Sequence, residues 1–96
     1  MRITPKYLRE RMVDVNRLLG RPVNMFLAPE SVVDGSMSVG HLTVDHNYGG
    51  YQLEETVSSH GAVHNITNRL TGKEMDCYIS GLLAGIALKN RHDSNN

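Results

Sequence analysis

The chain has 96 residues, a formal net charge of zero and a single cysteine, Cys77. This length corresponds to one domain, residues 1–96, and one cysteine excludes both an intrachain disulfide and a thiolate metal cluster. The longest uncharged apolar run, residues 77–88, is shorter than the roughly 20 residues of a membrane span, so we expect no membrane contact and a reducing cytoplasm.

The zero net charge hides an uneven distribution. Residues 1–21 carry six Lys or Arg against two acidic residues, which gives +4. Residues 22–68 carry five acidic residues and no Lys or Arg, which gives −5, and residues 69–96 return to +1. A basic segment followed by an acidic middle region can steer a charged partner or align two subunits. The alternative is an ordinary solvated basic helix face.

Residues 5–19 are predicted to form the first helix. Thr4 is a favourable N-cap, and Pro5 suits the first helical position, where no backbone N–H is required. Gly20 and Pro22 then end the helix. Apolar residues recur at helical spacing along one stripe: Leu8, Met12, Val15 and Leu19.

The middle of the chain is predicted to form three or four antiparallel strands. Turn residues divide it at Asp34-Gly35, at Tyr48–Tyr51 and at Ser59–Gly61, where Gly61 can adopt a positive φ. The apolar run of 23–27 predicts a first strand, and 62–68 predicts the last one. Between them, one strand face is expected to carry Tyr51, Leu53, Glu55 and Val57.

A second helix is predicted to begin at Thr71, because Thr71 and Glu74 have the spacing of a capping box. Gly81 and Gly85 lie in its interior, where each is less favourable than alanine by about 1 kcal/mol. Close approach of another helix is the usual reason for such glycines, and the neighbour is either the first helix or the second helix of another subunit. Because this helix is apolar on most of its faces, we favour the second and expect a homo-oligomer that forms through it. Residues 89–96 form a polar tail.

Together these elements predict an α+β fold with the order helix, three or four antiparallel strands, helix, and with both helices on one face of the sheet. The residues expected in the core are Leu8, Met12, Val15, Leu19, Met75, Ile79, Leu82 and Ile86.

The segment from His46 to Tyr51 has the composition of a ligand site. Paired glycines let a ligand approach the backbone, and a tyrosine ring can stack on a nucleotide base. Arginines of the first helix of a neighbouring subunit would hold the phosphate. The alternative is an ordinary hairpin whose tyrosines cover the sheet edge. The ligand-binding residues expected here are Asn47, Tyr48, Gly49, Gly50, Tyr51, Arg9 and His46.

We expect neither a metal site nor a catalytic residue nor a cofactor. His41, His46, His60 and His64 are close in sequence, but their spacing fits no known metal signature. Sequence neighbours in a strand point to opposite faces, so Asp45 and His46 do not form a proton relay. A nucleic-acid partner is not expected either, because the predicted sheet region lacks basic residues.

Three stretches cover most of the chain in order: Ile3–Leu8 leading to Asn16–Pro22, Val39–Leu53 and Tyr78–Gly85. They resemble a family of small, mostly uncharacterised proteins of tailed bacteriophages and prophages. The helix exit ending in Leu19-Gly20-Arg21-Pro22 and the Tyr48-Gly49-Gly50-Tyr51 turn are the most distinctive parts. The family usually has a glycine-rich turn near residues 58–61, of which this chain keeps Gly61.

The resemblance implies a phage accessory protein in the cytoplasm of the infected bacterial host. Such a protein would antagonise host defence by binding without catalysis, for example by sequestering a nucleotide immune signal. An alternative is a protein-binding inhibitor of a host defence complex, CRISPR or another, through the acidic middle region. A small nucleotide-processing enzyme that depends on His46 or His60 is a third hypothesis.

Overall fold

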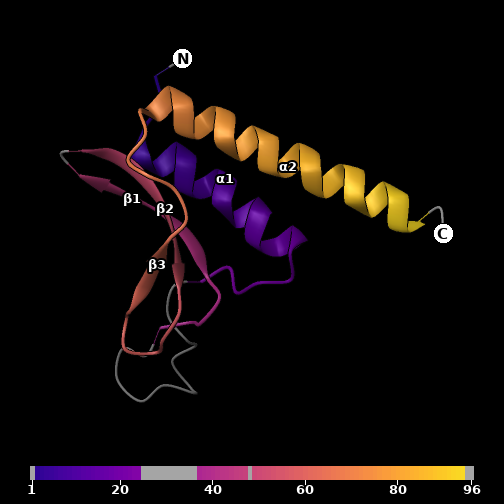
Figure 1. The fold of residues 1–96 in the computed structure, drawn as a ribbon, viewed down its shortest axis with the longest axis horizontal. Helices are drawn as coiled ribbons and strands as arrows, with labels where there is room; N and C mark the ends of the chain where they lie inside the picture. The colour runs from indigo at the N-terminus through magenta and orange to yellow at the C-terminus, as the bar shows by residue number, and fades with distance from the viewer. Residues whose placement is uncertain (1, 25–36, 48, 95–96) are drawn as a thin grey trace.

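The computed structural model describes residues 2–24, 37–47 and 49–94 (Figure 1). β2 (Gly50–Thr56) is the central strand of the sheet and pairs antiparallel with both β1 (Leu42–Asn47) and β3 (Val63–Asn65). Helix, three strands and helix follow one another, which confirms the predicted α+β class. The elements are α1 (Pro5–Leu18), β1 (Leu42–Asn47), β2 (Gly50–Thr56), β3 (Val63–Asn65) and α2 (Gly72–Ser94).

Local capping places the start of each helix where the sequence predicted it. The Tyr7 N–H donates to Thr4 Oγ1 at 3.1 Å, and Pro5 occupies the first helical position. Thr71 and Glu74 exchange reciprocal hydrogen bonds of 2.9 and 3.1 Å at the start of α2. Hydrogen bonding with Thr71 lowers the pKa of the Glu74 carboxyl because it favours the charged form. The bond from the Thr71 backbone N–H contributes most, and the bond with its side chain comes second.

The last strand is shorter than predicted. β3 comprises Val63–Asn65 instead of residues 62–68. The reason lies at Thr67, whose side-chain oxygen, not its carbonyl, accepts the Leu53 N–H at 3.1 Å. The Thr67 carbonyl instead accepts from Gln52 Nε2 at 2.9 Å, so the regular ladder ends there. The predicted first strand at 23–27 falls largely outside the described residues.

One hydrophobic cluster joins the two helices and the sheet. Alternate strand residues contribute to it, as expected for a sheet with one covered face. That both helices lie on the same face stays a prediction. In Figure 1 the two helices run side by side from the same end of the molecule, and α2 extends well past the end of α1. The buried members are Leu8, Met12, Val15, Leu42, Val44, Tyr51, Leu53, Met75 and Ile79.

Leu19, which was predicted to lie in the core, is exposed, and so is Val57, which was predicted to share a strand face with Tyr51 and Leu53. Leu19 is 45 % exposed, because it follows the last helical residue and no element of the described chain covers it. Val57 is 48 % exposed, since β2 ends one residue earlier and the alternation stops there. Leu82 and Ile86 are partly buried and pack against the core instead of lying within it.

Candidate functional site

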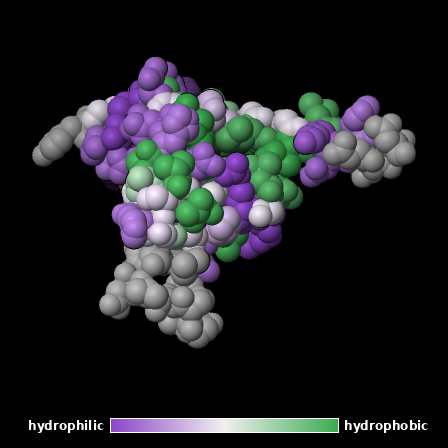
Figure 2. All heavy atoms as spheres, turned by 60° about the horizontal axis from the view of Figure 1, so that its bottom comes forward, coloured by the Kyte–Doolittle hydropathy of each residue, from purple (hydrophilic) through white to green (hydrophobic). Residues whose placement is uncertain are grey.

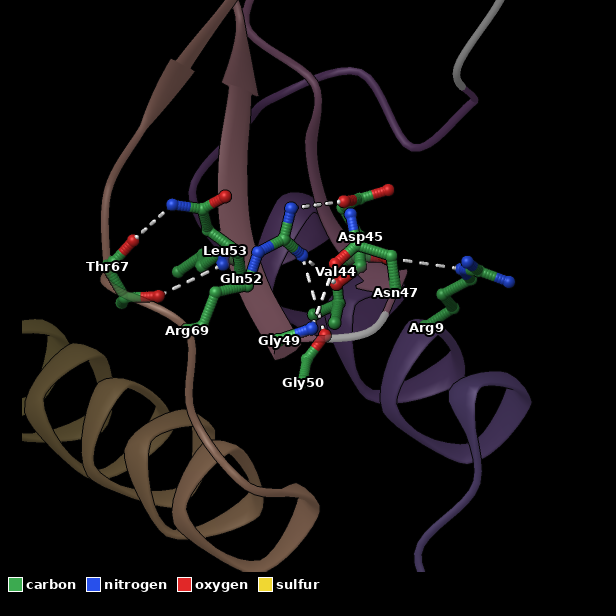
Figure 3. Close-up of polar contacts among 10 residues, drawn as sticks. All are labelled: Arg9, Val44, Asp45, Asn47, Gly49, Gly50, Gln52, Leu53, Thr67 and Arg69. Atoms are coloured by element: carbon green, nitrogen blue, oxygen red, sulfur yellow. Dashed lines mark hydrogen bonds and ion pairs between the residues drawn. The ribbon is translucent and has the colours of Figure 1, made fainter.

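The turn of the β1–β2 hairpin contains most of the predicted ligand residues (Figure 3). β1 ends at Asn47 and β2 begins at Gly50, which confirms the predicted turn between two strands. Asn47 Oδ1 accepts a hydrogen bond of 3.2 Å from the Gly49 N–H. Tyr48 lies outside the described residues, so its stacking on a base stays a prediction.

Both glycines of this turn are in close contact with the segment that leads into α2. Gly50 has a φ of +105°, and a Cβ there would lie 2.5 Å from the Leu70 carbonyl oxygen. This approach lets the Tyr51 and Leu70 backbones exchange hydrogen bonds of 2.8 and 2.7 Å. A Cβ at Gly49 would lie 3.1 Å from Arg69 Cγ. Packing within the chain therefore explains the glycine pair without a ligand.

Tyr51 belongs to the core, not to an open platform. Its side chain is 7 % exposed, and its ring stacks on the His46 ring with centroids 4.3 Å apart and planes 15° from parallel. His46 is directly opposite Tyr51 in the antiparallel pairing and is itself exposed. The pair is therefore a cross-strand stack in which the imidazole covers the phenol ring.

Arg69, in the segment that leads into α2, contacts this hairpin, and nothing in the sequence pattern singled it out. Its Nη2 is 2.9 Å from Asp45 Oδ2, and its Nη1 donates to the carbonyls of Asp45 and Gly50 at 3.4 Å each. Figure 3 shows the guanidinium lying across the end of the hairpin. The contact joins residues 24 positions apart, so no local spacing pattern could have revealed it.

The acidic middle region is divided by the fold. The Glu55 carboxylate pairs with Arg21 at 2.6 Å and is thereby partly neutralised. Glu54 projects from the other face of β2, the face that also carries Asp45 on β1. Burial and, to a lesser extent, the Asp45 charge raise the pKa of the Glu54 carboxyl, although Arg69 opposes them.

We expect Glu54→Gln to stabilise the fold at neutral pH and to have little effect under acid conditions. A raised folded-state pKa favours the neutral carboxyl, so its stabilising contribution is present at low pH and is lost as the pH rises through that pKa. Glutamine stays neutral throughout. Urea unfolding at acid and neutral pH measures the difference. The control Glu55→Gln should destabilise the fold at neutral pH, because it breaks the pair with Arg21. An equal effect of Glu54→Gln on stability at both pH values would contradict this explanation.

Apart from the hairpin turn, the structure has a concave region beside α1 and β1, here called the α1–β1 pocket, with a volume of about 230 Å³. The predicted ligand residue Arg9 lines it. Arg9 Nε donates to the Val44 carbonyl at 3.3 Å, and in Figure 3 its guanidinium points away from the hairpin turn. The structure thus separates Arg9 from the turn within one chain. The lining residues are Arg9, Met12, Val13, Asn16, Val23, Asn24, His41, Leu42 and Thr43.

Two buried polar side chains hold this pocket in shape. Asn16, 1 % exposed, donates to the Leu42 carbonyl at 2.8 Å and accepts from the Leu42 N–H at 2.9 Å, which fixes α1 to β1. His41, 6 % exposed, has its Nδ1 3.0 Å from the Pro22 carbonyl. Since a carbonyl only accepts, Nδ1 carries the proton, and in the neutral ring Nε2 is left as an acceptor. Neither role was indicated by a sequence pattern.

His46, His60 and His64 do not form a cluster. His46 stacks on Tyr51, while His60 and His64 are exposed in a turn and on β3. Within the described ranges, no three His, Cys, Asp or Glu side chains lie close enough together to hold a metal ion.

Comparisons with protein-family models, curated protein sequences and solved structures find no match to this chain. The resemblance to phage proteins therefore stays an expectation from the sequence. Among the described helices, neither combines the length and hydropathy that crossing a membrane requires.

Proposed function

We propose that this chain is a non-catalytic binding protein that holds an anionic, nucleotide-like ligand in the α1–β1 pocket. The observation that carries the proposal is the position of Arg9 beside a concave, mostly apolar surface. Ligand sites commonly combine apolar walls with a few well-placed polar groups.

The pocket offers both kinds of contact that a nucleotide requires, apolar contact for the base and a positive charge for the phosphate. Val13 and Val23 offer apolar contact to a flat ring, and the His41 and Thr43 side chains add hydrogen-bonding groups. Arg9 is anchored at Nε, and the rest of its fork can bind phosphate oxygens. A volume of about 230 Å³ is below the range of about 300–1,000 Å³ typical of drug-sized ligands, so we expect one nucleoside unit to enter.

The biological setting follows from the sequence resemblance. We propose a phage accessory protein that antagonises host defence in the bacterial cytoplasm by sequestering a nucleotide signal. Sequestration needs tight binding and slow release, and no bond in the ligand has to change.

Binding assays on a panel of linear and cyclic nucleotides test this proposal. We expect Arg9→Ala to weaken binding of the best ligand about 10- to 100-fold, because a charge-assisted contact to phosphate is lost. Native mass spectrometry and calorimetry would measure the loss. The matched control is Arg17→Ala, which removes an exposed arginine from the same helix outside the pocket and should leave the affinity unchanged. A panel without any binder, or equal losses in both variants, would contradict the proposal.

A second candidate is a protein-binding inhibitor of a host defence complex that uses the acidic sheet face. The observation that favours it is that Glu54 and Asp45 lie on the same face of the sheet, where burial and, second to it, the Asp45 charge raise the pKa of Glu54. Glu54→Lys should then abolish capture of a basic host protein and leave nucleotide binding intact. Retained capture by this variant would exclude the candidate.

A further inference from the structure

An open apolar groove runs along α2. Its volume is about 540 Å³. Figure 2 shows hydrophobic residues gathered over the arm of the molecule that α2 forms. Tyr78 is 38 % exposed and Leu88 is 61 % exposed, which is high for large apolar side chains. The groove is lined by Cys77, Tyr78, Gly81, Leu82, Gly85, Ile86 and Lys89.

The two glycines of the groove have no structural role within the described chain. A Cβ at Gly81 or Gly85 would meet no described atom within 4 Å. Neither has a positive φ, and glycine is unfavourable inside a helix. Of the two neighbours that the sequence left open, α1 is therefore not the reason for these glycines. What they leave free is a channel on the helix surface that a second helix can enter.

The groove consists of two parallel rows of side chains, each with a spacing of four residues. One row is small: Cys77, Gly81 and Gly85. The neighbouring row is bulky: Tyr78, Leu82 and Ile86. Such rows are the ridges and grooves through which helices pack.

We propose that a second copy of this chain covers the groove, with the two α2 helices antiparallel. In the register that places Leu82 against the partner's Gly81, every bulky residue meets a small one. Tyr78 then lies over the partner's Gly85, and Ile86 lies over the partner's Cys77. The two-fold axis makes each contact occur twice.

The charges along α2 favour the same orientation. Glu74 is near the start of the helix and Lys89 is near its end, so the antiparallel register places Glu74 opposite the partner's Lys89. The helix dipoles also oppose one another in this arrangement. A parallel pair would bring like charges together at each end. A second copy thus fits the groove in both shape and charge, and an unrelated protein helix would need the same complementary pattern.

Sedimentation velocity tests the interface. We expect the purified full chain to be a dimer at micromolar concentration. Gly85→Leu fills the space that the partner's Tyr78 occupies and should weaken dimerisation at least 100-fold. Its monomer should melt no lower than the wild-type chain, because the added side chain enters open space. A wild-type chain that stays monomeric, or a Gly85→Leu chain that stays dimeric, would overturn the proposal.

Cross-linking through Cys77 tests the orientation. In the antiparallel register the two Cys77 residues are separated by nine helical positions, about 14 Å along the axis, so they cannot form a disulfide. Ile86→Cys should give a dimer with two disulfides on mild oxidation. The matched control, Ala87→Cys, sits at the same height on another face and should cross-link at least 10-fold less. Disulfide formation by the wild-type chain would indicate a parallel pair and refute the register.

This interface shares no residue with the α1–β1 pocket. A monomeric chain that still binds nucleotide would refute the dimer alone, and a dimer that binds none would refute the proposed function alone.

Discussion

We expect Gly50→Ala to lower the free energy of unfolding by about 3 kcal/mol. Two effects add at this position. A φ of +105° is strained for any residue with a Cβ, and that Cβ would lie 2.5 Å from the Leu70 carbonyl oxygen. To relieve the contact, the chain must break the paired hydrogen bonds between Tyr51 and Leu70. Urea denaturation of the purified variant measures the loss.

Gly20→Ala separates the two effects. Gly20 also has a positive φ, +71°, but no described atom lies within 4 Å of a Cβ there. This control should therefore lose only the backbone strain, about 1 kcal/mol. Equal losses at Gly20 and Gly50 would show that the contact with Leu70 contributes nothing.

Asn16→Ala is the second large change, with an expected loss of about 3 kcal/mol. The side chain satisfies both backbone groups of Leu42 at 2.8 and 2.9 Å in a site that is 1 % exposed. Alanine removes both partners and leaves a buried N–H and a buried carbonyl without a hydrogen bond. Each orphaned group costs about 1–3 kcal/mol.

Thermal and urea unfolding of Asn16→Ala would measure this loss, with Asn68→Ala as the control. Asn68 is exposed, so its replacement should change stability by less than about 0.5 kcal/mol. Asn16→Ala should also weaken nucleotide binding, because α1 and β1 would no longer be fixed on either side of the pocket. A variant of wild-type stability would contradict the role of Asn16 as a clamp.

The helix boundaries could be predicted because their signals are local. Thr4 with Pro5, and Thr71 with Glu74, act within one helical turn, and the structure places the helix starts beside them. Leu19 shows the limit of the method. It continues the apolar stripe in sequence, but burial depends on whether another element covers that position.

The candidate site was harder to predict because its contacts are long-range. The Tyr-Gly-Gly-Tyr pattern is visible in the sequence, whereas the fit of Leu70 against Gly50 is not. Asn16 reads as an ordinary polar helix residue, and its contact with Leu42 joins positions 26 residues apart. The sequence predicts Arg9 as a phosphate ligand at the turn, but in the structure Arg9 lines the α1–β1 pocket instead.

Two-dimensional NMR of the labelled chain during titration with the best-binding nucleotide tests the central claim most directly. We predict saturable amide shifts at Val13, Asn24 and Thr43, which line the α1–β1 pocket. The amides of Asn47 and Gly49, in the hairpin turn, should shift much less. Shifts concentrated at the turn, with the pocket amides unmoved, would contradict the account and return the ligand to the site that the sequence first indicated.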